Sequence, residues 1–197
     1  MKHLPISLDR LAFIEAYFSS SAFGPIRRKN FEELKNPFEL HYALLKYDWE
    51  GGMQFVRWVA ESPICDLGTA LAIYWKMNPS FYMQFENESE ASHEGENVKE
   101  NFIFLKELEN RIFAEDFQTQ EIQYGPAKDE TNDFAFLDEV IGGKWKVAER
   151  LKKPSKGRTF QQFESYEEIY TTEEFRSFFQ KYEQEERSTY FTETSYA

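Results

Sequence analysis

The sequence is poor in the side chains that most often carry catalysis and metal binding. Among 197 residues it has one cysteine, Cys65, and three histidines, His3, His41 and His93. A single cysteine cannot form an internal disulfide, so we expect the chain to fold in a reducing compartment, the cytoplasm. Because no histidines or cysteines stand at ligand spacing, the sequence predicts no metal and no cofactor.

Long apolar runs are missing as well. The longest, Ala70 to Trp75, is far shorter than the roughly 20 residues that a membrane-spanning helix needs. The first residues, Met1 to Pro5, lack the charged and apolar regions of a signal peptide. We therefore expect no membrane association and a cytoplasmic location.

Positive charge is the third deficit, since 23 lysines and arginines face 35 acids and the formal net charge is -12. This balance argues against general binding of nucleic acids, which requires basic groups for the phosphates. Five glutamates stand close together with no lysine or arginine between them: Glu86, Glu88, Glu90, Glu94 and Glu96. Such a cluster is typical of a solvated face, but it also suits a basic partner or weak cation binding.

Motifs for phosphate binding and for serine hydrolases are absent too. Gly51-Gly52 and Gly142-Gly143 lack the spacing of a phosphate-binding loop, and no glycine-flanked serine occurs. Pairs of acids are so numerous that spacing alone selects none of them for catalysis. No catalytic residue is assigned from the sequence.

What the sequence does contain is apolar residues at helical spacing, with 20 phenylalanines among them. We predict a mainly α fold, a compact bundle of short antiparallel helices, with minor β structure in the C-terminal third. A helical N-terminal half (1–85) is followed by a mobile acidic loop (86–97) and a helical C-terminal half (98–197), which together form one integrated domain. A brief extended piece is expected within 118–125, and 159–170 fits either a helix or a strand.

Several helix starts carry capping residues. Ser7 is expected to cap a helix that ends near residue 20, and Asn36 with Pro37 and Glu39 forms a capping box. Asn30 is expected to open a short helix over 31–35, and Thr171 with Glu174 to open the last helix. The final residues, 188–197, are expected to fray or fold back.

Cys65-Asp66 is the stretch most like a catalytic site. A thiol near a helix N-terminus can act as a nucleophile when a base, here His41, comes close. The structural alternative makes Asp66 an N-cap that accepts from the amide of Gly68 or Thr69, with Cys65 as a small apolar plug. We favour the structural interpretation. An enzyme that uses Cys65 and His41, or carboxylates in a cleft between the helical halves, remains the rival.

Two motifs resemble a bacterial domain family of unknown function. They are Tyr47-Asp48-Trp49-Glu50-Gly51-Gly52 and Cys65-Asp66-Leu67-Gly68-Thr69-Ala70-Leu71, and the likeness spans residues 38–83. The family carries Tyr-x-Trp-Asp-x-Gly and Cys-Asp-x-Gly-Thr-Ala-Leu, so Glu50 replaces an aspartate. The resemblance implies signature residues and no catalysts: Trp49, Gly52, Cys65, Asp66, Gly68 and Thr69. It also implies a small helical accessory protein, and some similar bacterial proteins are antidotes to secreted toxins.

Charge, abundant aromatic residues and the lack of catalytic groups together predict a non-catalytic protein-binding module. We expect an immunity-type antidote whose acidic face covers a basic toxin. A plain scaffolding unit is the third alternative, and the oligomeric state stays open. The predicted contacts are Glu86, Glu88, Glu90, Glu94, Glu96, Glu173, Glu183, Glu185 and Glu186.

Overall fold

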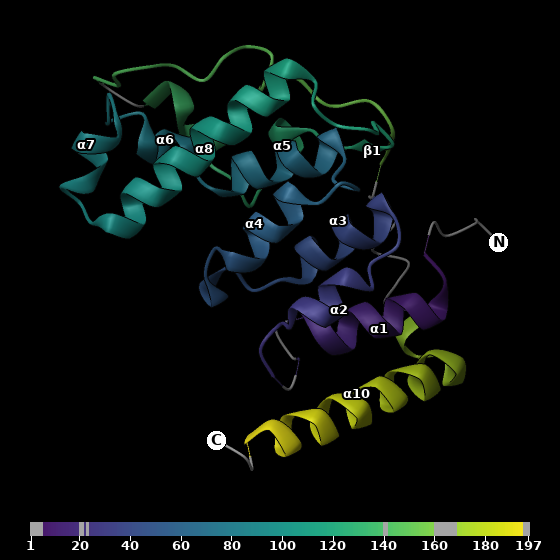
Figure 1. Cartoon of the computed structure of the whole chain (residues 1–197). Helices are drawn as coiled ribbons and strands as arrows, with labels where there is room; N and C mark the ends of the chain where they lie inside the picture. The colour runs from purple at the N-terminus through teal and green to yellow at the C-terminus, as the bar shows by residue number, and fades with distance from the viewer. Residues whose placement is uncertain (1–5, 20–21, 23, 140–141, 160–168, 195–197) are drawn as a thin grey trace. The chain divides into compact units, whose positions relative to one another are not determined.

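A computed structural model describes residues 6–19, 22, 24–139, 142–159 and 169–194, which are mainly helical, as predicted (Figure 1). The chain divides into two compact units, residues 1–59 with 161–197 and residues 60–160. The boundaries of these units differ from those of the predicted halves, 1–85 and 98–197. That all of them form one integrated domain stays a prediction.

The first unit joins the two ends of the chain. Its last helix, α10 (Glu173–Thr194), lies along its first, α1 (Leu8–Phe18), and α1 packs against α3 (Pro37–Lys46) (Figure 1). The Tyr182 hydroxyl on α10 donates to Asp9 of α1 at 2.9 Å, and its ring meets the ring of Phe13 edge-on. The remaining elements are α2 (Arg28–Glu32), η1 (Trp49–Gly51) and most of α4 (Gln54–Glu61).

Two of the predicted caps in this unit are confirmed. The side chain of Ser7 accepts from the amide of Arg10, and the side chain of Asn36 accepts from the amide of Glu39 at 3.0 Å. Each such cap contributes about 1 kcal/mol to helix stability. The Glu39 carboxylate also pairs with Arg10 at 2.8 Å, so the capping box connects α3 to α1.

Three local predictions for the first unit are wrong. Asn30 lies buried inside α2, which begins at Arg28, because the buried side chain of Phe31 fixes the register of this short helix. The cap of α10 is Thr172 and not Thr171, since the Thr172 hydroxyl accepts from the amide of Phe175. The residues from 188 to 194 continue α10 because its inner face is held on α1; residues 195–197 lie outside the described part.

The second unit is built around α5 (Leu67–Lys76) and α8 (Glu96–Ala114), which pack on one another. Trp75 of α5 is fully buried, and its indole N–H donates to the carbonyl of Leu151 at 2.8 Å. Burying a large apolar side chain contributes about 2–3 kcal/mol. Trp75 therefore fixes the late segment around Leu151 against the helical core.

A short parallel β pair completes the second unit. The strands β1 (Ile122–Gln123) and β2 (Arg158–Thr159) pair in register, with Ile122 opposite Arg158, and β1 packs on α5. The extended piece predicted within 118–125 and the minor β structure of the C-terminal third are thus confirmed. Of the ambiguous stretch 159–170, residue 159 is strand, residues 160–168 lie outside the described part, and residues 169–170 are helical. The other elements are α6 (Pro79–Tyr82), α7 (Glu88–Ser92), η2 (Pro126–Lys128) and η3 (Phe134–Glu139).

The acidic stretch 86–97 is not a loop throughout, because it contains α7. Asn87 caps this helix by accepting from the amides of Ser89 and Glu90 at 3.0 and 3.1 Å. The Glu90 carboxylate reaches back to the amide of Glu86 at 2.8 Å, and Ala91 is fully buried. The sequence signal for this start was present in Asn87-x-x-Glu90, which resembles a capping box.

Candidate functional site

Asp66 is the most heavily bonded side chain of the Cys65-Asp66 stretch. It is fully buried and caps α5, as predicted, by accepting from the amide of Gly68 at 2.8 Å. The same carboxylate accepts from the Thr119 hydroxyl at 2.8 Å and from the amides of Glu121 and Ile122 at 2.7 and 3.3 Å. Four donors therefore surround one buried carboxylate, which fastens the start of α5 to the segment that forms β1.

Gly68 allows this close approach. A Cβ atom at position 68 would lie 2.1 Å from the carbonyl oxygen of Ile122, far inside van der Waals contact. On the other side of the strand, Gly157 has φ +121° and packs against the backbone of Glu121. The spacing Asp66-x-Gly68 thus allows β1 to pack closely against the start of α5. Thr69 is fully buried in the same first turn.

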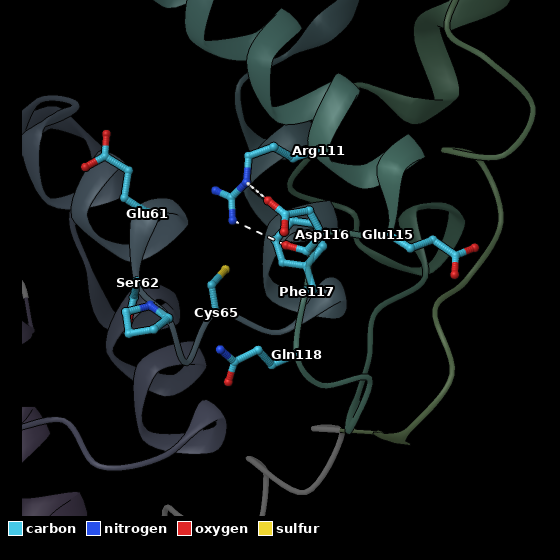
Figure 2. Close-up of a pocket in the computed structure, with 9 residues that line it drawn as sticks. Glu61, Ser62, Cys65, Arg111, Glu115, Asp116, Phe117 and Gln118 are labelled. Carbon is cyan, nitrogen blue, oxygen red and sulfur yellow. Dashed lines mark hydrogen bonds and ion pairs between the residues drawn. The ribbon is translucent and has the colours of Figure 1, made fainter.

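Cys65 lines a hollow of about 300 Å³ next to this junction. Figure 2 shows its side chain among Arg111, Asp116, Phe117 and Gln118. The residue is nevertheless 2% exposed, and the thiol lies 3.7 Å from the carbonyl oxygen of Asp66. Burial raises the pKa of Cys65 to about 12, although the nearby guanidinium of Arg111 acts in the opposite direction.

The charged groups around this hollow are already engaged within the second unit. Arg111 donates to the carbonyl of Ala60 at 2.7 Å and pairs with Asp116 at 3.4 Å, and its guanidinium lies over the Phe117 ring. Glu115 forms an ion pair with Arg150. These contacts join the ends of α4 and α8. The charged residues around Cys65 therefore have a structural role, which is to hold the two helix ends together.

The arrangement is unsuited to thiol chemistry at neutral pH. A catalytic cysteine needs a lowered pKa and a base within hydrogen-bond reach. Burial instead raises the pKa of the Cys65 thiol, so the thiol stays protonated at neutral pH. No histidine is among the described residues that line the hollow, and His41 lies buried on α3 in the other unit. These findings favour the apolar plug over the nucleophile.

The predicted acidic contacts of the second unit lie on and beside α7 and the start of α8, which pack together as a hairpin. We call residues 86–100 the acidic hairpin. Glu86, Glu88, Glu94 and Glu96 are exposed, whereas Glu90 is partly buried by its capping contact. Lys99 is the single lysine of this stretch, which has no arginine, and it pairs with Glu96 at 2.9 Å. Within the described residues, no cluster of three or more His, Cys, Asp or Glu is suitably placed to hold a metal ion.

The predicted contacts on α10 differ from one another in their exposure to solvent. Glu186 is 3% exposed and forms an ion pair with Arg27, so its assignment to a binding surface is wrong. It faces inward because α10 lies along α1, which buries one side of the helix. Glu183 pairs with Arg187 at 3.0 Å, and only Glu173 and Glu185 of this set are fully exposed.

The first signature motif forms the turn between α3 and α4. The Asp48 carboxylate caps η1 by accepting from the amide of Glu50 at 3.0 Å, and Trp49 is the first residue of that short helix. The Tyr47 hydroxyl donates to the carbonyl of Gly52 at 2.7 Å. Gly52 has φ +91°, a conformation that favours glycine. The hydrogen bond from Tyr47 to Gly52 thus joins the first and last residues of the turn.

The comparisons with known proteins agree with the resemblance at the level of a family. Residues 35–113 are similar to a family described as Domain of unknown function (DUF4274). The matched range begins just before α3, contains both motif stretches and ends in α8. Neither the curated proteins nor the solved structures contain a significant match to the chain. No described helix is long and apolar enough to span a membrane.

Sequence reasoning missed the partners of the motif residues. Thr119 and Glu121 bind Asp66, and Arg111 reaches the end of α4, but each is remote in sequence from the group that it contacts. Their residue types carry no local signal, because a single threonine or arginine is common on any surface. The aromatic residues Tyr47 and Trp58 were also not assigned, although they stand in and beside the first motif.

Proposed function

We propose that this chain is a non-catalytic module that binds a basic protein, with the acidic hairpin as its main contact surface. The observation that carries the proposal is the exposure of four glutamates along two packed helices and the turns beside them: Glu88 and Glu96 begin α7 and α8, Glu86 precedes α7, and Glu94 lies in the turn between the helices. Six glutamates and one lysine stand between residues 86 and 100. Such a surface attracts a basic partner over long range and favours fast association.

The hairpin holds these carboxylates in a preformed arrangement. Capping by Asn87 and burial of Ala91 order α7, and Gly95, with φ +135°, turns the chain into α8. An ordered surface loses less conformational entropy on binding than a flexible acidic loop does. The correction of the loop prediction therefore supports specific binding more than it supports a solubility tail.

Exposed aromatic rings lie on elements that precede and follow the acidic hairpin in the chain. Phe81 of α6 is 44% exposed, and its ring meets that of Phe85, which directly precedes Glu86. Phe136 is 56% exposed on η3, which packs on α6. Aromatic side chains are enriched at protein interfaces, where they provide most of the binding free energy. They give the charged surface a candidate apolar anchor.

We further propose that the partner is a toxin and that this chain is its immunity-type antidote. The support is the resemblance to a bacterial domain family of unknown function, since some similar bacterial proteins are antidotes to secreted toxins, together with the net charge of -12. An antidote acts by covering its target and needs no catalytic group, which suits the protonated, buried thiol of Cys65.

The proposal is tested with charge-reversal variants. The partner is captured from the native host at low salt, identified by mass spectrometry and purified. Its affinity is then measured for the unaltered chain and for a variant in which Glu86, Glu88, Glu94 and Glu96 are changed to lysine. We expect a basic partner, a loss of affinity of at least about a hundredfold and a weaker salt dependence.

A matched control reverses four other exposed glutamates, Glu33, Glu61, Glu107 and Glu130. This control has the same net charge as the hairpin variant but leaves the hairpin intact. We expect it to retain most of the affinity. Equal losses in the two variants, or capture of an acidic partner, would contradict the proposed surface.

A further inference from the structure

The first unit contains a hollow of about 330 Å³ with aromatic walls. It lies between the end of α1, residues 22 and 24–26, the signature turn and α4. Its lining includes the rings of Phe18, Phe55, Tyr47 and Trp58, and Asp48 stands among them. We call it the aromatic pocket.

The rings have distinct places in the pocket. Phe18 and Phe55 are 1% and 2% exposed and form its floor, with ring centroids 5.5 Å apart. Tyr47 and Trp58 are half-buried, and the Tyr47 ring lies 4.8 Å from that of Phe55. The pocket is therefore a recess with two buried rings and two half-buried rings in its walls.

The signature turn builds one wall of this pocket. The hydroxyl of Tyr47 is fixed by its hydrogen bond to Gly52. A Cβ atom at Gly51 would lie 2.7 Å from that hydroxyl oxygen, so glycine at residue 51 lets the phenol ring lie over the turn without a shift. This gives the Tyr47–Gly52 motif a role besides turning the chain, namely to present an aromatic ring to the pocket.

The electrostatics of the pocket favour a cation. The faces of aromatic rings carry partial negative charge, and exposed Asp48 adds a full negative charge. The described lining residues include no lysine, arginine or histidine, although Arg28 lies close to one of the rings. The same aromatic cluster already binds a cation elsewhere, since the Arg28 guanidinium lies 5.1 Å from the centre of the Trp58 ring and 5.0 Å from that of Phe31.

We propose that the aromatic pocket receives a cationic side chain, arginine or lysine, of the basic partner. The inference rests on the proposed function, because it identifies a contact by which the same partner is bound. The occupant follows from charge complementarity. A neutral apolar side chain would fill the recess but would gain nothing from Asp48, whereas a cation contacts both the rings and the carboxylate.

The test uses short probe peptides and the full chain with 15N-labelled tryptophan. An acetylated and amidated Gly-Gly-Arg-Gly-Gly peptide is titrated while the indole N–H resonances are followed by NMR. Matched peptides carry lysine, neutral citrulline or norleucine in place of arginine. We expect the arginine and lysine peptides to shift the Trp58 resonance and to bind at least about threefold more tightly than the neutral peptides. The buried indole of Trp75 in the other unit serves as an internal reference.

Two variants locate the binding. Asp48→Asn keeps an acceptor for the amide of Glu50 and should weaken binding of the arginine peptide about threefold or more, while Trp58→Leu should weaken it about tenfold. Asp116→Asn, at an exposed aspartate of the other unit, is the matched control and should have no effect. If Trp58→Leu does not fold, Asp48→Asn and the citrulline peptide still decide the question.

Equal binding of arginine, citrulline and norleucine peptides would overturn the inference, and so would binding that Asp48→Asn leaves unchanged. Failure here is separable from failure of the proposed function. If the native partner binds Asp48→Asn and Trp58→Leu with full affinity but loses affinity for the hairpin variant, only the aromatic pocket is wrong. If the partner binds the hairpin variant normally, the proposed surface is wrong whatever the peptides show.

Discussion

The α-carbon of Gly68 faces the carbonyl oxygen of Ile122 so closely that an added methyl carbon would lie 2.1 Å from that oxygen. We predict that Gly68→Ala lowers the free energy of unfolding by about 3 kcal/mol, since the strand must move and the buried Asp66 carboxylate then loses donors. Urea denaturation measures this change. Gly125→Ala is the control, because its Cβ would meet Pro154 at an ordinary 3.5 Å and its φ is -127°. A mild effect of Gly68→Ala would mean that the strand does not dock as described.

Cys65 should resist alkylation in the folded protein. Burial raises its pKa from 9.0 to about 12, so the thiolate fraction at pH 7.5 falls about a thousandfold. We expect no measurable modification by iodoacetamide over an hour, and complete modification in guanidinium chloride, as judged by intact mass. Rapid labelling of the native chain would instead revive the enzyme hypothesis.

Glu186→Gln should destabilise the first unit, because it removes the buried negative charge that pairs with the guanidinium of Arg27. We expect a loss of about 3 kcal/mol in the free energy of unfolding, measured by urea titration. Glu185→Gln, at the adjacent exposed position, should change it by less than about 0.5 kcal/mol. Similar values for the two variants would show that α10 does not bury Glu186 against α1.

Alkaline pH should loosen the packing of α10 on α1. Burial, with nearby carboxylates, raises the pKa of Tyr17 and of Tyr182 to about 12 from the ordinary value of 10.0. A raised tyrosine pKa means that the folded state holds its proton more tightly than the unfolded chain. The associated stability is fully present below pH 10 and is lost as pH rises toward 12.

Tyrosine absorbance at 295 nm and urea midpoints at stepped pH measure this effect together. Tyr182→Phe should remove one late-titrating group and reduce the fall in stability. Ionisation of every tyrosine near pH 10 in a chain that is still folded would contradict the assignment.

Local signals explain the predictions that the structure confirms. Ser7, Asn36 and Asp66 were recognised as caps because their partners lie two or three residues away. Asn87 and Glu90 carry the same kind of local signal within the acidic stretch, where the density of charge instead predicts a loop. Asn30 shows the limit of such signals, since a good cap residue was drawn into the helix by the burial of its neighbour Phe31.

The candidate sites depended on distant contacts, so the sequence pointed to them only in part. It identified the acidic stretch and the Cys65-Asp66 motif. It did not reveal that Glu186 faces Arg27, or that Tyr47 and Trp58 line a pocket with Phe18. Each of these facts requires that segments far apart in the chain come together.

By itself the sequence determined the helical class, most helix starts and the negative charge, because periodicity, capping and composition act over a few residues or none. Only the tertiary structure decided which acids stay in water, how deeply the single thiol is buried and which aromatic rings enclose a recess. The physical reason is that exposure is a property of packed neighbours, and here those neighbours come from opposite ends of a unit.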